Sequence, residues 1–145
     1  MPVFLLWSHN AGYCSYKGDR KEGSTNEMML LIVDDHAAMR RLIRRLVSDL
    51  ADQIEECSGG EEVLAAYEQH HFNGSDWVLM DVEMGKMDGL TATRQLRAAH
   101  PEARIIIVTK YNDDQLRAAA FQNGACGFVP KENLLALRSL LNPAA

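Results

Sequence analysis

The chain has 145 residues, of which 47% are hydrophobic and 24% charged, a composition that favours one globular domain with its own core and excludes wholesale disorder. Its formal net charge of −5 argues against direct nucleic-acid binding, which needs a basic surface. No apolar run approaches the ~18 residues of a membrane span, so no membrane contact is expected.

The three cysteines, at positions 14, 57 and 126, are odd in number and lack metal-ligand spacing. Because Cys57 and Cys126 fall in apolar, strand-like runs, they are interpreted as buried free thiols. Free thiols are typical of a reducing compartment, and a cytoplasmic location is expected.

The elements in chain order begin after residues 1–27, which show no sustained periodicity and are predicted to be a disordered leader. The apolar run at 29–33 has the length of a buried parallel strand, and it ends at Asp34-Asp35. From His36 onward, hydrophobic residues recur at helical spacing. They are Met39, Leu42, Ile43, Leu46, Val47 and Leu50. Four arginines between positions 40 and 45 occupy the other face of this helix. They are interpreted as a solvated face, or as a docking surface for a partner protein.

The middle of the chain continues the alternation of strand and helix. A more polar run at 53–57 indicates an edge strand. Ser58 and Glu61 have capping-box spacing and are expected to open the second helix. A third apolar run, at 78–80, stops abruptly at Asp81.

The remaining predicted elements continue this alternation of strands and helices. The expected ranges are a helix at 88–99, a strand at 104–108, a helix at 112–124, a strand at 125–129 and a helix at 132–141. Asn112 is the expected cap of the fourth helix. Strands that alternate with helices in this way predict right-handed crossovers and a parallel sheet, which is an α/β fold.

Chemically active residues stand at four of the predicted strand ends. Asp34 and Asp35 follow the first strand, Asp81 the third and Thr109 the fourth, and Lys131 lies just past the fifth. The carboxyl ends of parallel strands share one edge, where ligands bind. Clustered carboxylates repel one another, and Mg2+ is the natural counter-ion because it takes oxygen ligands. Acids, metal, ammonium and hydroxyl together indicate a phosphoryl-transfer site.

This ordered set of motifs, from about residue 28 to 141, resembles the receiver domain of two-component response regulators. The matching motifs are Asp34-Asp35, Asp81, Met87-Asp88-Gly89, Thr109, Gly124-Ala125 and Lys131. The stretch 124–131 is most similar to receivers that usually carry a helix-turn-helix output domain. The resemblance implies a flavodoxin-like (βα)5 doubly wound parallel sheet of strand order 2-1-3-4-5 over residues 28–142, with 143–145 as a tail.

The resemblance also implies that Asp81 accepts a phosphoryl group from a histidine kinase or a phosphotransfer protein. Asp35 and Asp81 would bind Mg2+ through their carboxylates, with the backbone carbonyl of Glu83 as a further ligand. Asp34 would act through water.

The other site residues are assigned by the same resemblance. Lys131 would pair with Asp81 and then with a phosphoryl oxygen. Thr109 would turn inward to the phosphoryl group, and Phe128, at the family's aromatic switch position, would follow it. Their movement would reshape the face of the fourth helix, fifth strand and fifth helix, which would then bind a downstream protein or a second copy. Glu83 and Tyr111 flank the phosphoryl position and are predicted to set the lifetime of the acyl phosphate.

Four positions depart from the family pattern. Gly85 stands where proline is common, so this loop is expected to be more flexible. Lys110 replaces a small residue, and its bulk or charge could hinder the phosphodonor. Glu132 replaces the proline that often follows Lys131, so the cis bond common there is not expected. Phe128 lacks the hydroxyl of a tyrosine.

The favoured function is therefore a phosphorylation-activated switch, a phosphoacceptor rather than a turnover enzyme, although it could catalyse its own phosphotransfer and dephosphorylation. The chain ends soon after the last predicted helix, which suggests a stand-alone receiver or a fragment. Two alternatives stay open: a scaffold that works without phosphorylation, and a small phosphatase with an aspartyl intermediate. The individual residues also have simpler interpretations, such as a turn-capping Asp81 and helix-capping Asp34 and Asp35.

Overall fold

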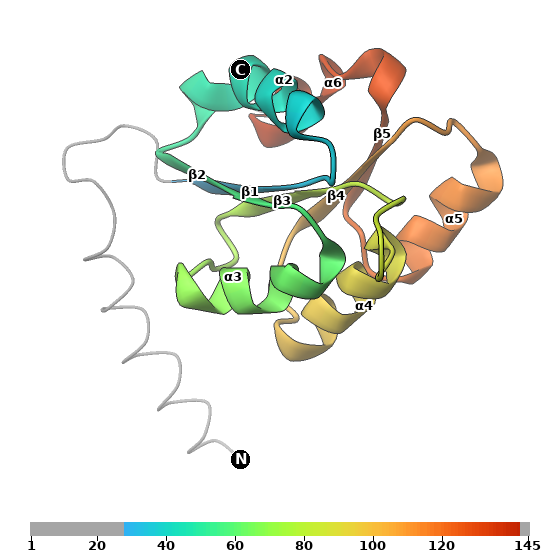
Figure 1. Cartoon of the computed structure of the whole chain (residues 1–145), viewed down its shortest axis with the longest axis horizontal. Helices are drawn as coiled ribbons and strands as arrows, with labels where there is room; N and C mark the ends of the chain where they lie inside the picture. The colour runs from blue at the N-terminus through green and yellow to red at the C-terminus, as the bar shows by residue number, and fades with distance from the viewer. Residues whose placement is uncertain (1–27, 143–145) are drawn as a thin grey trace.

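The computed structural model describes residues 28–142, and the predictions for residues 1–27 and 143–145 lie outside that range. Five strands alternate with five α-helices in the described part (Figure 1). The strands are β1 (Met29–Val33), β2 (Gln53–Cys57), β3 (Trp77–Met80), β4 (Ile105–Thr109) and β5 (Gly127–Pro130). The helices are α2 (Ala37–Val47), α3 (Val63–Gln69), α4 (Gly89–Ala99), α5 (Asp114–Gln122) and α6 (Ala136–Leu141).

All the strand pairs are parallel, and the sheet order is β2-β1-β3-β4-β5. Helices α2 and α6 cover one face of the sheet, and α3, α4 and α5 cover the other (Figure 1). The predicted doubly wound fold, its strand order and the edge position of β2 are therefore confirmed.

Alternation along the central strands divides the interior into two cores. Leu31 and Val33 of β1 point to the layer beneath α3 and α4, whereas Leu30 and Ile32 point to the layer beneath α2 and α6. A strand that faces apolar neighbours on both sides must be hydrophobic at every position. This explains why β1 and β4 are continuous apolar runs and are buried throughout.

Three predicted helix starts differ from the observed ones. Asp113, not Asn112, caps α5, because its carboxylate accepts hydrogen bonds from the backbone N–H groups of Gln115 and Leu116. At the second helix, the backbone N–H and hydroxyl of Ser58 both bond Glu62 rather than Glu61.

A 3-10 turn at Gly60–Glu62 delays α3 to Val63, and another at Lys131–Asn133 delays the last helix to Ala136. The predicted helix over 132–141 is therefore shorter than expected. In both cases the chain leaves its strand in a tight turn before it reaches helical geometry.

Two burial predictions were wrong. Leu42, assigned to the core face of the first helix, is 41% exposed, because the buried stripe of α2 is centred on Ile43 and Val47. Cys126 is exposed rather than buried, since it precedes β5 and contributes only its backbone N–H to the sheet, bonded to Ile105. Cys57, by contrast, is buried as expected.

A buried carboxylate at the opposite end of the sheet was not anticipated. Asp76 is 1% exposed, and its two oxygens accept hydrogen bonds from the backbone N–H groups of Met29 and Asn73. It therefore ties the start of β1 to the turn before β3. Among the described residues, none of the helices is both long and apolar enough to cross a bilayer.

Candidate functional site

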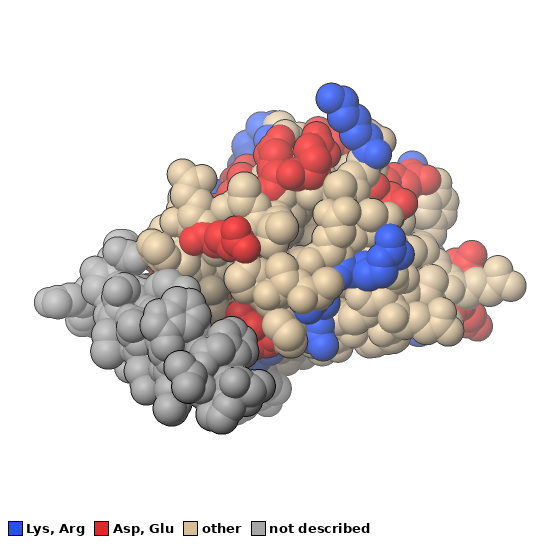
Figure 2. Space-filling view, turned by 90° about the horizontal axis from the view of Figure 1, so that it is seen from below, with Lys and Arg blue, Asp and Glu red and all other residues tan. Residues whose placement is uncertain are grey.

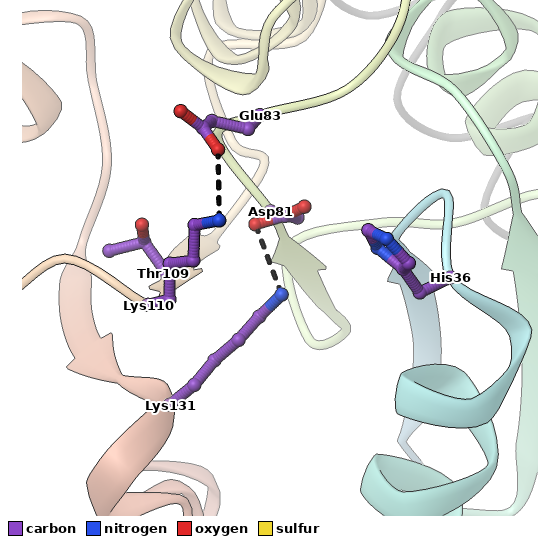
Figure 3. A pocket seen from close by; sticks show the side chains of 6 residues that line it. All are labelled: His36, Asp81, Glu83, Thr109, Lys110 and Lys131. Atoms are coloured by element: carbon purple, nitrogen blue, oxygen red, sulfur yellow. Dashed lines mark ion pairs between the residues drawn. The ribbon is translucent and has the colours of Figure 1, made fainter.

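The carboxyl ends of the strands bring the predicted site residues to one edge of the sheet. A pocket at this edge is lined by His36, Asp81, Glu83, Thr109, Lys110 and Lys131 (Figure 3). Four of these six were singled out in the sequence. His36 was assigned no role there, although it directly follows the acidic pair, and Lys110 was noted only as an obstacle.

Asp81 is held at the bottom of the pocket by backbone contacts on both sides. Its N–H donates to the carbonyl of Val33 at 2.9 Å, which extends the β1–β3 ladder by one residue. Gly89 donates its N–H to the carbonyl of Val82 at 2.8 Å and so closes the loop that follows. The Asp81 side chain is 6% exposed, so one open side of the pocket is its route to solvent.

Asp34 is the second buried acid of the site. It is 1% exposed, and its Oδ1 accepts the backbone N–H of His36 at 2.8 Å. Its Oδ2 accepts a hydrogen bond from Lys131 Nζ, also at 2.8 Å. Lys131 Nζ lies 3.3 Å from Asp81 Oδ1. The lysine therefore bridges the two acids, and its shorter contact is to Asp34 rather than to Asp81.

This arrangement shifts the acid–base properties of the site. Burial, and then the negative charge of Asp34, raise the pKa of Asp81 to about 6, although the ammonium of Lys131 opposes the shift. Burial alone would lower the pKa of Lys131. The hydrogen bond to Asp34 and the charges of both acids outweigh that effect, so the pKa of Lys131 is raised. At neutral pH the site thus holds an Asp81 carboxylate whose ionisation is unfavourable, beside a lysine whose charged form is stabilised.

The raised pKa of Asp81 predicts a pH-dependent gain in stability for Asp81→Asn. A folded-state pKa of about 6, against a model value of 3.8, means that ionised Asp81 destabilises the fold as pH rises through 6. We expect the variant to be more stable than the wild type by about 1–2 kcal/mol at pH 7.5, a value reduced for solvent screening. Below about pH 4 the gain should vanish. Urea unfolding in the presence of a chelator, at both pH values, measures it, and an equal effect at both would contradict the prediction.

The donor atoms beside Asp81 suit a hard cation. Asp34, Asp35 and His36 each offer one ligand atom, and these atoms lie within 4.8 Å of one another. Both oxygens of Asp34 already accept hydrogen bonds, which fits an indirect role through water. Asp35 is exposed and reaches solvent at the rim. Four acids (Asp34, Asp35, Asp81 and Glu83) against two lysines (Lys110 and Lys131) leave excess negative charge, and a mainly oxygen donor set of this kind fits Mg2+.

The remaining predicted residues lie around the pocket. Thr109 is buried, and its Oγ1 accepts the backbone N–H of Tyr111 at 3.2 Å. The Tyr111 ring is 43% exposed and lies outside the pocket lining. Phe128 is only 6% exposed, with the guanidinium of Arg117 lying 4.8 Å from its ring centre. Its ring is therefore buried, covered in part by Arg117.

Three of the four arginines of the α2 cluster are exposed, as the solvated-face interpretation predicts, and only Arg40 is partly buried. Arg40 and Arg44 each hydrogen-bond Glu56 at the end of β2, both at 2.8 Å. Arg40 also donates to the backbone carbonyl of Asp34 at 2.6 Å. Arg41 and Arg45 remain exposed. Part of the cluster thus anchors the loop that carries the acidic pair, a role that required knowing that β2 lies beside β1.

Comparison with known proteins identifies the family. A sequence profile described as the response regulator receiver domain matches residues 30–142. The chain belongs to the receiver domain family. Receiver domains are phosphoacceptors rather than classical enzymes, and phosphorylation and Mg2+ binding are general to them.

Individual relatives agree with this assignment. The response regulator UvrY of Escherichia coli K12 is 35% identical over 118 residues, which cover 77% of this chain and 53% of UvrY. The chemotaxis protein CheY of Bacillus subtilis is 34% identical over 103 residues, covering 70% of this chain and 83% of CheY. The chain therefore spans about half the length of relatives such as UvrY.

Solved structures show the same fold. Chemotaxis protein CheY4 of Vibrio cholerae superposes with a TM-score of 0.71 at 22% identity, over 81% of this chain and 98% of CheY4. A two-component response regulator of the LuxR family from Aurantimonas gives a TM-score of 0.68 at 28% identity, over 79% of this chain and 85% of that chain.

Proposed function

We propose that this receiver domain, residues 28–142, is the phosphorylation-driven switch of a two-component system. Asp81 accepts the phosphoryl group from a histidine kinase or a phosphotransfer protein. The observation that carries the proposal is the Asp34–Lys131–Asp81 bridge at the base of an open pocket. It presents one carboxylate to a donor while holding a cation ready for the transferred group.

Each site residue has a part in this proposal. Lys131 keeps Asp34 as its partner and turns from Asp81 to a phosphoryl oxygen. Thr109 gives up the hydrogen bond from the Tyr111 N–H and donates its hydroxyl to another oxygen. Phe128 stays buried beneath Arg117 and occupies the space near Thr109. The new contacts of Lys131 and Thr109 with phosphoryl oxygens exist only in the phosphorylated state, so they bias the domain toward a second conformation.

Mg2+ is the proposed cofactor, held by Asp35, Asp81 and the backbone carbonyl of Glu83, with Asp34 acting through water. When bound, it would neutralise the acidic edge and polarise the phosphoryl oxygens. The side chains of Glu83 and Tyr111 are proposed to set how long the acyl phosphate survives. Variants at either position with an unchanged rate of phosphate loss would reject that role.

The output surface in this proposal is the face of α5, β5 and α6. Three exposed apolar side chains lie in these helices or just before α6: Phe121 in α5 at 44%, Leu140 in α6 at 38% and Leu135 before α6 at 66% exposure. Exposed apolar clusters often mark protein contacts, so a downstream protein or a second copy is the proposed partner. The side of the sheet that α3, α4 and α5 cover, seen from below in Figure 2, mixes acidic and basic side chains among uncharged ones. In the described residues, that visible face offers no broad basic surface for nucleic acid.

The free thiols of Cys57 and Cys126 fit a cytoplasmic location.

A single experiment tests the proposal. The protein is incubated with Mg2+ and acetyl phosphate and its intact mass is followed over time. We expect the mass of one phosphoryl group to be gained by the wild type and by Asp114→Asn, an exposed acid at the start of α5. Asp81→Asn should gain nothing. Repeated turnover of a phosphoester would indicate a phosphatase instead, and no mass gain would indicate a scaffold.

A further inference from the structure

Lys110 places a second ammonium group at the mouth of the pocket. It follows Thr109 directly at the end of β4 and lines the same pocket as Asp81 and Lys131. Its Nζ lies 3.5 Å from Glu83 Oε1, across the gap between the loops that follow β3 and β4 (Figure 3). Lys131 reaches the pocket from the other side, so Asp81 lies between two cationic side chains.

The contact between Lys110 and Glu83 is weak. The two side chains are 63% and 57% exposed, and their separation exceeds that of a good hydrogen bond. Exposed ion pairs of this kind contribute little to stability. Lys131, by comparison, is 15% exposed and hydrogen-bonded to a buried acid. Lys110 is therefore the cation of this site that can change partner at small cost.

Phosphorylation of Asp81 would change what Lys110 faces. The carboxylate charge is replaced by a phosphoryl group that carries up to two negative charges and lies nearer the pocket mouth. That group repels the Glu83 carboxylate and attracts the ammonium more strongly than Glu83 does. On the basis of the proposed function, we propose that Lys110 binds the incoming phosphoryl group, and that Glu83 competes with it for Lys110.

The chemical step needs no further reactant. A carboxylate oxygen of Asp81 forms a bond to phosphorus as the bond from phosphorus to the acetate oxygen of acetyl phosphate breaks. Acetate leaves with the bonding electron pair, and no proton is transferred. The ammonium of Lys110 contacts the oxygens of the transferred phosphoryl group, which carry the negative charge in the transition state. The large side chain at this position is thus a ligand for the donor rather than an obstacle, because its ammonium binds the phosphoryl oxygens.

The first test measures the second-order rate of phosphorylation by acetyl phosphate with Mg2+, from intact mass. We expect Lys110→Ala to be slower than wild type by about threefold or more, as for loss of one charged contact, and Lys110→Arg to keep most of the rate. The matched control is Lys86→Ala, an exposed lysine in the loop after β3 that lies outside the pocket lining. It removes the same charge and should stay near the wild-type rate.

The second test asks whether Glu83 acts through Lys110. Glu83→Gln should raise the rate of the wild type, both by releasing Lys110 and by removing a repelling charge, and should raise it clearly less in a Lys110→Ala background, where only the second effect remains. An equal increase in both backgrounds would overturn the proposal, since Glu83 would then act by its own charge alone. So would a Lys110→Ala rate equal to that of the wild type or of Lys86→Ala.

The mass gain of the wild type separates a failure of the proposed function from a failure of the Lys110 exchange. If the wild type gains no phosphoryl group, the proposed function falls, and this inference falls with it. If the wild type is phosphorylated on Asp81 but the Lys110 and Glu83 variants behave independently, only the partner exchange is wrong. Thermal melts of all variants check the fold, which substitutions at these exposed side chains should leave intact.

Discussion

Replacing Gly89 by alanine is expected to destabilise the domain by about 3 kcal/mol or more. An added Cβ would collide with the carbonyl oxygen of Asp81 and lie 2.8 Å from the carbonyl carbon. It would also come within 3.0 Å of Met80 Cγ. Because the obstacle is backbone at the end of β3, either α4 or the phosphoacceptor loop must move. Urea unfolding measures the loss, and slower phosphorylation of Asp81 would accompany it.

Gly85 in the same loop is the matched control. A Cβ there would meet nothing within 4 Å, so Gly85→Ala should change the free energy of unfolding by no more than about 1 kcal/mol, in either direction. If Gly89→Ala were as mild as Gly85→Ala, the start of α4 could shift freely, and the close approach to Asp81 would not be a constraint.

Replacing Lys131 by methionine should also have a large effect. We expect the free energy of unfolding to fall by about 2–4 kcal/mol at pH 8 in the presence of a chelator. The substitution keeps the length of the side chain but leaves Asp34 and Asp81, 1% and 5% exposed, with no ammonium between them. Two unneutralised buried acids repel each other, and removing one member of a buried ion pair is far more harmful than removing an exposed one.

The loss caused by Lys131→Met should shrink as the pH is lowered to 5. Without the ammonium, the pKa of Asp81 rises above its wild-type value of about 6, so the carboxyl takes up a proton and the repulsion ends. Adding Asp81→Asn should recover most of the lost stability at pH 8 for the same reason. A loss that is independent of pH, or that persists in the double variant, would show that Lys131 matters for packing rather than for charge.

The sequence by itself determined the α/β class, the parallel sheet and the gathering of chemically active residues at one sheet edge, whereas the strand order 2-1-3-4-5 and the roles of the site residues came from the resemblance to receiver domains. Apolar runs such as 29–33 and 105–108 must be buried on both faces, and the helices between them force parallel pairing. Parallel pairing in turn carries Asp34, Asp81 and Thr109 to one edge. These inferences need only local hydrophobic patterns and the handedness of crossovers, both of which can be read from neighbouring residues.

Only the tertiary structure decided how the site residues are partnered. The hydrogen bond from Lys131 to Asp34 joins residues 97 positions apart, and no local pattern indicates which of two acids a lysine prefers. The Arg40 contact with Glu56 and the Lys110 contact with Glu83 likewise depend on which loops lie side by side. The exposure of Leu42 and Cys126 depended on where the neighbouring elements stop. Such contacts are set by distances and side-chain orientations that exist only once the layers have packed.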